Sequence, residues 1–276
     1  SEYGNSIVIG EDNSIYITGT TYSDIVDGQI SNGLGDVFIT KLNSHGIKQW
    51  TTLSGSLGNE NGSGISIDSD NNIYITGTTN GNLDGQINHG SDDGFISKFS
   101  SKGTKLWTKL VGSSTYDRSN DIGIDKDGYI YITGHTYGNL DGNINSGSSD
   151  VFFSKFSPNG LKLWTKLIEN NDPWAANSNE NPQSILLDTS GNIYITGSSN
   201  SFIIPGSNTG KSGLGTSGGI TGGGVFISKF NSLGEYQWLR ETGTTNKYDI
   251  SFDIAFDSNN YIYITGYTNG SLPGYG

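Results

Sequence analysis

Asp68, Asp70 and Asn72 carry side-chain oxygens at alternate positions, the spacing of the first ligands in a calcium-binding loop. The rest of such a loop is missing, because Thr76 stands at its ninth position and no carboxylate stands at its twelfth. Asp and Asn also cap tight turns through hydrogen bonds to their own backbone. We therefore predict turn capping at this segment, with calcium bound by these three residues as a minor hypothesis. No other cofactor is expected.

Catalytic chemistry finds little support in the sequence. His135 is one of only three histidines, and no second catalytic partner lies near it in the chain. The sequence has no cysteine, and it contains neither a Ser-His-Asp signature nor a zinc-binding helix. The glycine-rich stretch 210–224 lacks the Gly-Lys-(Ser/Thr) ending of a phosphate-binding loop. We predict no catalytic residue.

Aromatic residues are better candidates for contact with a ligand. Trp174 follows Asp172-Pro173 and has no counterpart elsewhere in the chain. An exposed Trp can stack on a sugar ring or anchor a protein partner, although it can also fold back as a local lid. The predicted ligand-binding residues are Trp174, Tyr22, His135, Tyr137 and Tyr267.

A repeat must position these residues. The motif Ile-Tyr-Ile-Thr-Gly recurs without change five times, beginning at Ile15, Ile73, Ile130, Ile193 and Ile262. A second motif, in which Phe precedes Lys by three residues, ends at Lys41, Lys98, Lys155 and Lys229. A tryptophan follows each second motif with spacings of 57, 57 and 74 residues, at Trp50, Trp107, Trp164 and Trp238. A regular period near 57 residues with one enlarged unit indicates a repeat architecture.

Each unit contains four short segments rich in β-branched and aromatic residues, separated by Gly, Asn, Asp and Ser. In the second unit these segments, named strands A, B, C and D in order, are Gly64–Asp68, Ile73–Gly77, Phe95–Phe99 and Lys105–Leu110. Four antiparallel strands in each unit predict an all-β fold, namely a β-propeller of four-stranded blades. A β-solenoid is the alternative, but its turns are usually shorter and carry fewer hairpin signals.

About five blades are predicted within one propeller domain, 1–276, and the last blade is incomplete. The units lie at about 1–57, 58–114, 115–177, 178–247 and 248–276. The last unit stops soon after its strand B, whereas a closed ring needs a whole number of blades and an unpaired strand edge invites aggregation. We therefore expect the chain to be an excerpt of a larger propeller, or the ring to be completed by missing residues or another chain.

The alternation of strands sorts the connections into two faces. The A–B and C–D turns are short hairpins on one face, and the B–C and D–A loops are long and lie on the opposite face. The fourth unit has two insertions, in its D–A loop (169–183) and its B–C loop (199–224), and both fall on the long-loop face. Variable loops on a rigid scaffold often bind ligands, so this face is the predicted site. A Gly/Ser-rich insertion that is only a flexible loop remains an alternative.

The other repeated residues are predicted to be structural. The strand C lysines are expected to pair with repeat aspartates between blades or to extend to the rim. The strand B tyrosines are expected to pack inside the blades, and the strand D tryptophans are expected at the wider outer rim.

Composition excludes several classes of function. The chain has 276 residues with Asp+Glu 27 against Lys+Arg 15, so its formal charge is −12. An acidic balance argues against nucleic acid, whose binding depends on basic residues that neutralise phosphates. No apolar run approaches the length of a membrane span. With no cysteine there is no disulfide framework and no thiolate zinc site.

The repeated segments resemble the bacterial β-propeller repeats of the SBBP family. The pattern Asp-x-x-Gly-Asn-Ile-Tyr-Ile-Thr-Gly, then Asp-Val-Phe-Ile-x-Lys-Phe-Asn-x-x-Gly, then Leu-Trp, is similar to that repeat in nearly every unit. The resemblance implies a propeller and, commonly, a secreted or cell-surface bacterial protein. It implies little about activity, because the family has no shared catalytic motif. One departure is Gly224, which stands where other units have Asp36, Asp93 and Asp150.

The predicted function is therefore a non-catalytic, extracellular or cell-surface bacterial module for binding, adhesion or assembly. Its partner would be a glycan, another protein or copies of itself. One alternative is a hydrolase or lyase with an axial pocket, and another is a purely structural repeat domain of a filament or envelope protein. The fold alone cannot choose among them, because propellers host both enzymes and binding modules.

Overall fold

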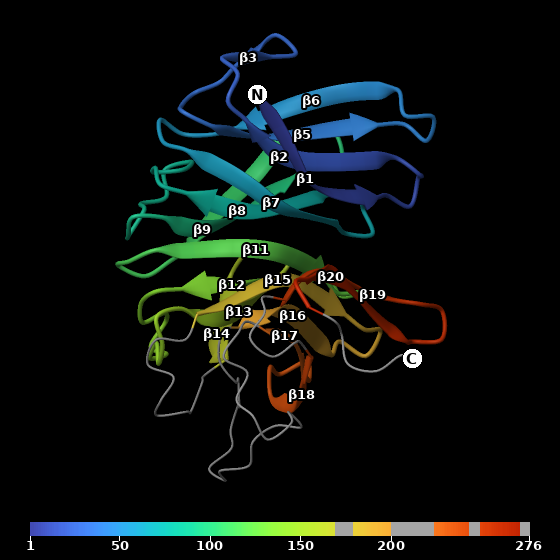
Figure 1. Cartoon of the computed structure of the whole chain (residues 1–276). Helices are drawn as coiled ribbons and strands as arrows, with labels where there is room; N and C mark the ends of the chain where they lie inside the picture. The colour runs from blue at the N-terminus through green and yellow to red at the C-terminus, as the bar shows by residue number, and fades with distance from the viewer. Residues whose placement is uncertain (169–178, 200–223, 243–248, 271–276) are drawn as a thin grey trace. The chain divides into compact units, whose positions relative to one another are not determined.

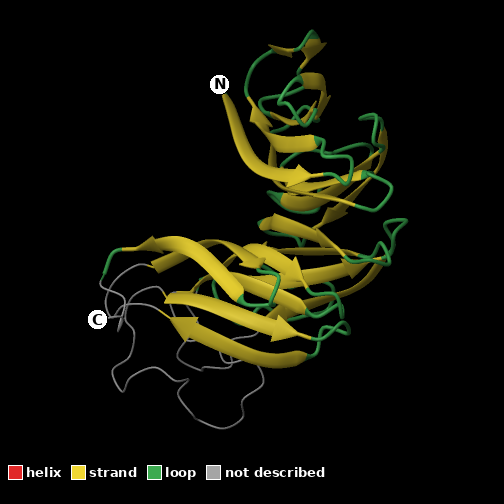
Figure 2. Ribbon diagram, turned by 90° about the vertical axis from the view of Figure 1, so that its right-hand side faces the viewer, coloured by secondary structure: helices red, strands yellow, loops and turns green. Residues whose placement is uncertain are grey.

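A computed structural model describes residues 1–168, 179–199, 224–242 and 249–270 of the chain. The regular elements of these residues are β-strands (Figure 2), as the sequence predicts. In the described ranges no helix is long and apolar enough to cross a membrane. Two compact units can be distinguished, one of residues 1–132 and 155–163, and one of residues 133–154 and 164–276.

Four four-stranded sheets follow one another along the chain, each with its strands in the order A, B, C, D (Figure 1). The first consists of β1 (Glu2–Ile9), β2 (Ile15–Thr21), β5 (Asp36–Leu42) and β6 (Lys48–Ser54). The second consists of β7 (Glu60–Ile67), β8 (Ile73–Thr79), β9 (Asp93–Phe99) and β10 (Lys105–Val111). The third consists of β11 (Asp117–Ile124), β12 (Ile130–Thr136), β13 (Asp150–Phe156) and β14 (Lys162–Ile168).

The fourth sheet consists of β15 (Glu180–Leu187), β16 (Ile193–Ser199), β17 (Gly224–Phe230) and β18 (Tyr236–Thr242). A final pair, β19 (Asp249–Phe256) and β20 (Ile262–Thr268), forms a two-stranded sheet that corresponds to strands A and B of a fifth repeat. A small hairpin, β3 (Ile25–Val26) and β4 (Gln29–Ile30), lies in the first B–C loop. The all-β fold of four-stranded antiparallel blades, about five in number, is confirmed.

The register between strands B and C is the same in the first, second and fourth sheets. In the second sheet Tyr74 pairs with Lys98, and Gly77 pairs with Phe95. A Cβ atom on Gly77 would lie 1.9 Å from the backbone oxygen of Asn61 and 2.9 Å from the Phe95 ring. The last residue of the Ile-Tyr-Ile-Thr-Gly motif is therefore glycine because strand A and the strand C phenylalanine both crowd this position.

Strand A begins earlier than the sequence predicts and contains a β-bulge. In the second sheet it starts at Glu60, four residues before the predicted Gly64, and its pairing with β8 shifts at Ser63. The same irregularity recurs in the A strands β1, β15 and β19. A bulge leaves one extra residue unpaired and bends the strand, which hides this part of strand A from a simple alternation pattern.

The core lies between neighbouring sheets within each compact unit. In the first unit it includes Tyr16, Ile39, Ile75 and Phe95, all fully buried. In the second unit the Phe153 and Phe230 rings lie 4.5 Å apart, centroid to centroid. Apolar residues cover both faces of strand B, which explains why the B strands are apolar runs.

The strand D tryptophans Trp50, Trp107 and Trp164 each contact the C–D turn of the following repeat. A Cβ atom on Gly103 would lie 3.0 Å from the Trp50 ring, and one on Gly160 would lie 3.2 Å from the Trp107 ring. Both glycines have positive φ, 79° in each case. The turn therefore needs glycine for its backbone conformation and also for the close approach of the indole. This contact explains why tryptophan and the turn glycine recur together.

Candidate functional site

Of the residues predicted to bind a ligand, Trp174 lies outside the described residues, and so do most residues of the two insertions. Tyr22, directly after β2, is 45% exposed. Its ring meets Tyr3 of strand A edge to face, with centroids 6.1 Å apart. Tyr3, which the sequence analysis did not single out, is also exposed. An exposed aromatic pair of this kind offers a flat apolar surface with hydroxyl groups at its rim.

His135 and Tyr137 lie together in the second unit, with ring centroids 5.9 Å apart and planes at 72°. Their exposures differ, since His135 in β12 is buried whereas Tyr137, directly after β12, is 45% exposed. The imidazole therefore supports the tyrosine ring from inside the sheet. Of this pair, the phenol is the group that an external ligand can reach.

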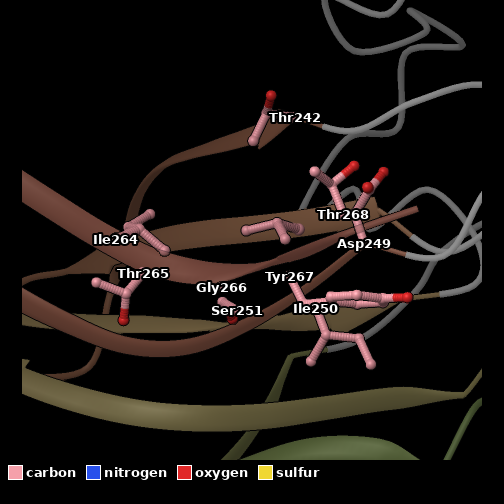
Figure 3. A pocket seen from close by; sticks show the side chains of 10 residues that line it. Thr242, Asp249, Ile250, Ser251, Ile264, Thr265, Gly266, Tyr267 and Thr268 are labelled. Atoms are coloured by element: carbon pink, nitrogen blue, oxygen red, sulfur yellow. The ribbon is translucent and has the colours of Figure 1, made fainter. Parts of the chain in front are cut away.

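Tyr267 in β20 is half exposed and lines a pocket of about 270 Å³ (Figure 3). The structure therefore presents three of the predicted residues, Tyr22, Tyr137 and Tyr267, at the strand B ends that lead into the B–C loops. Tyr22 and Tyr137 occupy the same position of the repeat, where the second repeat has Asn80.

Tyr116 and Arg118 form a further cluster that sequence reasoning missed. The Arg118 guanidinium lies 4.8 Å from the centre of the Tyr116 ring, a cation–π contact. Asp92 pairs with Tyr116 as a parallel bridge between two long loops. The pKa of the Asp92 carboxyl is raised, because the effect of burial exceeds the opposite effects of the Arg118 charge and the Tyr116 hydroxyl. Arg118 could have been noticed in the sequence, because arginine occurs only at positions 118 and 240.

The long-loop face also buries carboxylates. Asp93 at the start of β9 and Asp117 at the start of β11 are both fully buried. Asp93 Oδ2 accepts a hydrogen bond from the backbone of His89 (2.9 Å), and Asp117 Oδ2 accepts bonds from the backbone (2.7 Å) and hydroxyl (2.8 Å) of Ser113. Burial and the Asp117 charge raise the pKa of Asp93, and the hydrogen bond from His89 lowers it. These carboxylates order the loops that precede their strands.

The same arrangement occurs where the first repeat leads into the second, with Asp36 at the start of β5 and Glu60 at the start of β7. Asp36 accepts a bond from the backbone of Asn32 (2.9 Å), and Glu60 accepts bonds from the backbone and hydroxyl of Ser56 (2.6 Å each) and from Thr79 (2.6 Å). Both carboxylates are fully buried. Side chains so enclosed cannot exchange protons with a bound substrate, so we assign them to loop anchoring.

The B–C loops of the first repeats fold back along strand D. In the second repeat, Asp84 bonds to the Lys105 ammonium at 2.7 Å and to the Thr108 hydroxyl at 2.5 Å, both in β10. Leu83 beside it is buried. The first repeat has the equivalent contact between Asp27 and Lys48, at 2.5 Å. These loops cover the outer strand edge, and the accessible part of the long-loop face is near the ends of strand B.

Asp68, the first residue of the calcium hypothesis, caps its own turn. Its Oδ1 accepts the backbone N–H groups of Asp70 (3.1 Å) and Asn72 (2.8 Å), and its Oδ2 accepts the Asn72 amide (2.9 Å) and the Tyr74 hydroxyl (2.9 Å). Burial raises the pKa of Asp68, but the hydrogen bonds from Asn72 and Tyr74 outweigh it, and the net pKa is lowered. The calcium hypothesis stays a prediction, and a cation would have to displace these donors.

Lys41 and Lys98, two of the four repeated lysines, pair with aspartates of their own blade, so the expected pairing between blades is wrong for these two residues. Lys98 lies 3.5 Å from Asp68 and 4.7 Å from the Tyr74 ring centre, and all three belong to the second sheet. Lys41 likewise lies 3.4 Å from Asp12 within the first sheet. The B–C register causes this pairing, because it places each lysine opposite the strand B tyrosine. We call each such aspartate, tyrosine and lysine a turn triad.

Together, the repeated antiparallel sheets, their shared register and the glycine-bounded hairpins define a β-propeller protein. The SBBP beta-propeller repeat model matches residues 49–84, 106–141, 163–204 and 237–273, which is more than half of the chain. The chain belongs to this family of β-propeller repeats. The resemblance inferred from the sequence is confirmed.

Two sequence relatives are much longer than this chain. "Regulatory protein FlaEY" of Caulobacter vibrioides is 24% identical over 169 residues, which are 55% of this chain and 18% of that protein. An uncharacterized WD repeat-containing protein of Acanthamoeba polyphaga mimivirus is 27% identical over 266 residues, 80% of this chain and 19% of that protein. The chain thus spans about a fifth of the length of each of these relatives.

A solved structure shares the fold. The GH93 alpha-L-arabinofuranosidase of Fusarium graminearum, in complex with arabinobiose, has a TM-score of 0.52 and 10% sequence identity. The alignment covers 96% of this chain and 70% of that chain. At this level of identity the likeness supports the fold and carries no activity over to this chain.

Proposed function

We propose that this β-propeller is a non-catalytic bacterial module, secreted or on the cell surface, that binds a glycan or protein partner at its long-loop face. The observation that carries the proposal is the exposure of Tyr22 and Tyr137 at the same position of the first and third repeats. The repeat does not need tyrosine there, because the second repeat has Asn80, which bonds to the backbone of Asn59. Exposed aromatic rings are the side chains that most often anchor sugars and protein partners.

The acidic groups of this face favour binding over catalysis. Asp36, Asp93 and Asp117 are fully buried and hold backbone N–H groups. His135 is buried as well. A general acid or base must come within hydrogen-bonding distance of the substrate proton. A ligand on this face would instead meet tyrosine rings, hydroxyl groups and the Arg118 guanidinium.

A glycan microarray, with a protein-interaction screen beside it, tests the proposal. We expect the wild-type chain to bind at least one ligand. The double variant Tyr22→Ala/Tyr137→Ala should bind that ligand at least tenfold more weakly, which is a loss of about 1.4 kcal/mol in binding free energy. Tyr261→Ala is the matched control, since Tyr261 is a similarly exposed tyrosine but lies in a hairpin turn on the opposite face. Equal binding by the double variant and the wild type would reject this site.

A further inference from the structure

A pocket of about 350 Å³ lies between strand D of the second repeat and the C–D hairpin of the third repeat. It is lined by Lys109 and Leu110 of β10, and by residues 156 and 159–162 of the hairpin. All of these residues belong to the first compact unit. None of them lies in a B–C loop or at the strand B ends that carry Tyr22 and Tyr137, so this pocket is distinct from the site proposed above.

The polar side chains of this pocket are mainly hydrogen-bond donors. Lys109 and Lys162 carry ammonium groups, and no aspartate or glutamate is among the lining residues. Asn159 Oδ1 accepts a hydrogen bond from the Ser157 hydroxyl, which leaves the amide NH₂ group of Asn159 to donate to a ligand. In a chain with a formal charge of −12, such a pocket favours an anion.

Lys109 is the cation of this pocket that a ligand can pair with. It is half-buried, and no ion pair or hydrogen bond joins its ammonium to another side chain in the part of the chain that the structure describes. Lys41 and Lys98, by contrast, lie beside aspartates of their own blades. A partly desolvated charge without a counter-charge is unfavourable, so an anion beside Lys109 is stabilised.

The other repeats show that joining neighbouring blades does not require an open pocket here. The residue two positions after the strand D tryptophan packs on the next C–D turn in two cases. Thr52 donates its hydroxyl to the backbone oxygen of Gly103 at 3.2 Å. The Lys166 stem covers Gly234, since a Cβ atom on this glycine would lie 3.0 Å from Lys166 Cδ. Lys109 occupies the same position of its repeat, and the pocket lies between it and the turn.

The remaining surface of the pocket is apolar. It is formed by Leu110, Phe156 and Leu161, of which Phe156 is buried. At the turn, the three atoms nearest to a Cβ atom on Gly160 all belong to the Trp107 ring. Ligand pockets of this size combine an apolar lining with a few placed polar groups. The apolar lining can pack against one face of a sugar ring while the donors bind its charged substituent.

An extended peptide fits this place less well than a sugar. The outer edge of β10 is covered by the loop in which Asp84 bonds to Lys105 at 2.7 Å, so a peptide strand cannot pair with it. A volume of about 350 Å³ is near the lower limit of ligand pockets and suits a single ring.

We propose that this pocket binds an anionic sugar residue, with Lys109 pairing with its carboxylate or sulfate group. Lys162 adds positive charge, and the Asn159 amide donates a hydrogen bond to the sugar. Leu110 and Phe156 pack against the ring. This site acts independently of ligand binding through Tyr22 and Tyr137.

Isothermal titration calorimetry of the full chain tests the proposal with three probes: a galacturonic acid trisaccharide, a sulfated galactose trisaccharide and a neutral galactose trisaccharide. We expect saturable binding of at least one anionic probe, and at least tenfold weaker binding of the neutral one. Lys109→Thr introduces the residue of the first repeat and should weaken binding at least tenfold, whereas Lys109→Arg keeps the charge and should retain it. Lys102→Thr makes the same charge change in an exposed C–D turn and should leave binding unchanged.

Circular dichroism and the melting temperature of each variant separate loss of binding from loss of folding. Failure of both anionic trisaccharides to bind the wild-type chain would overturn the proposal, as would equal binding by a folded Lys109→Thr variant. An oligoglutamate peptide that binds more tightly than either trisaccharide would assign the pocket to an acidic peptide, against the proposal. The Tyr22→Ala/Tyr137→Ala variant should bind the anionic trisaccharide as the wild type does, and loss of binding by this variant would place the site on the long-loop face instead.

Discussion

The substitution Gly112→Ala tests the buried carboxylates of the long-loop face. Gly112 follows β10, and its φ lies outside the left-handed region, so its backbone conformation is open to alanine. The obstacle is Asp93, because a Cβ atom at position 112 would lie 2.1 Å from Asp93 Oδ1 and 2.4 Å from its Cγ. The substitution therefore pushes directly on the carboxylate without changing any charge.

The size of the effect follows from these distances. The carboxylate must move by about 1.3 Å to reach 3.4 Å, the start of ordinary van der Waals contact. Such a shift breaks the 2.9 Å bond from the His89 backbone. Overpacking costs about 1–3 kcal/mol and a lost hydrogen bond to a charged group about 1.5–3 kcal/mol, so we expect a loss of roughly 3–5 kcal/mol. At about 2–4 °C per kcal/mol for large domains, the melting temperature falls by roughly 10 °C.

A double-mutant cycle with Asp93→Ala separates this mechanism from a general effect of alanine. If Gly112→Ala acts through the carboxylate, it should cost less than about 1 kcal/mol in the Asp93→Ala background, which leaves a coupling of at least about 2–4 kcal/mol. Urea unfolding and calorimetry of the four proteins measure it. Equal costs of Gly112→Ala in both backgrounds would refute the reasoning.

Three further predictions concern titration, the turn triad and calcium. The raised pKa of Asp93 means that the folded chain holds this proton more tightly than the unfolded chain, so its stabilising effect is complete below about pH 3.8 and is lost as pH rises through the folded pKa. Asp93→Asn should therefore gain in melting temperature relative to wild type between pH 4 and 7, and a pH-independent difference would contradict this. Tyr74→Phe removes the bond to Asp68 and should cost about 1 kcal/mol in urea unfolding, whereas Tyr261→Phe should cost nothing measurable. Because Asp68 is saturated with donors, EDTA should leave the melting temperature unchanged, and a rise of several degrees on addition of calcium would instead support the metal hypothesis.

The sequence was sufficient to predict the fold because the same local signals occur in every unit. Each Ile-Tyr-Ile-Thr-Gly segment is a B strand, and each hairpin lies at its predicted Asp, Asn or Gly turn. The start of strand A was less predictable, since the bulge at Ser63 interrupts its alternation and places polar residues inside the strand. A pattern method treats Glu60 as a loop residue, although it is fully buried and paired.

The candidate site was only partly predictable, because its chemistry depends on burial. Asp36 and Asp93 are acidic residues beside a long loop, and the sequence alone does not show that both are enclosed. The path of the B–C loops along strand D could not be predicted from the sequence either. The sequence predicts Asp84 to be an ordinary turn residue. The structure shows that Asp84 bonds to Lys105 of strand D and so holds the loop against that strand.

The internal repeats provide a criterion that separates structural residues from candidates for function. Asp68, Tyr74 and Lys98 have counterparts in other repeats that share part of these contacts, because Lys41 lies near Asp12 and over the Tyr16 ring, and Tyr194 bonds to Asp188, so a structural role explains them. Position 22 of the first repeat is different, because the matching residues of the next two repeats are asparagine and tyrosine while the strands around them keep their register. A residue that can vary while the blade stays the same is available for recognition.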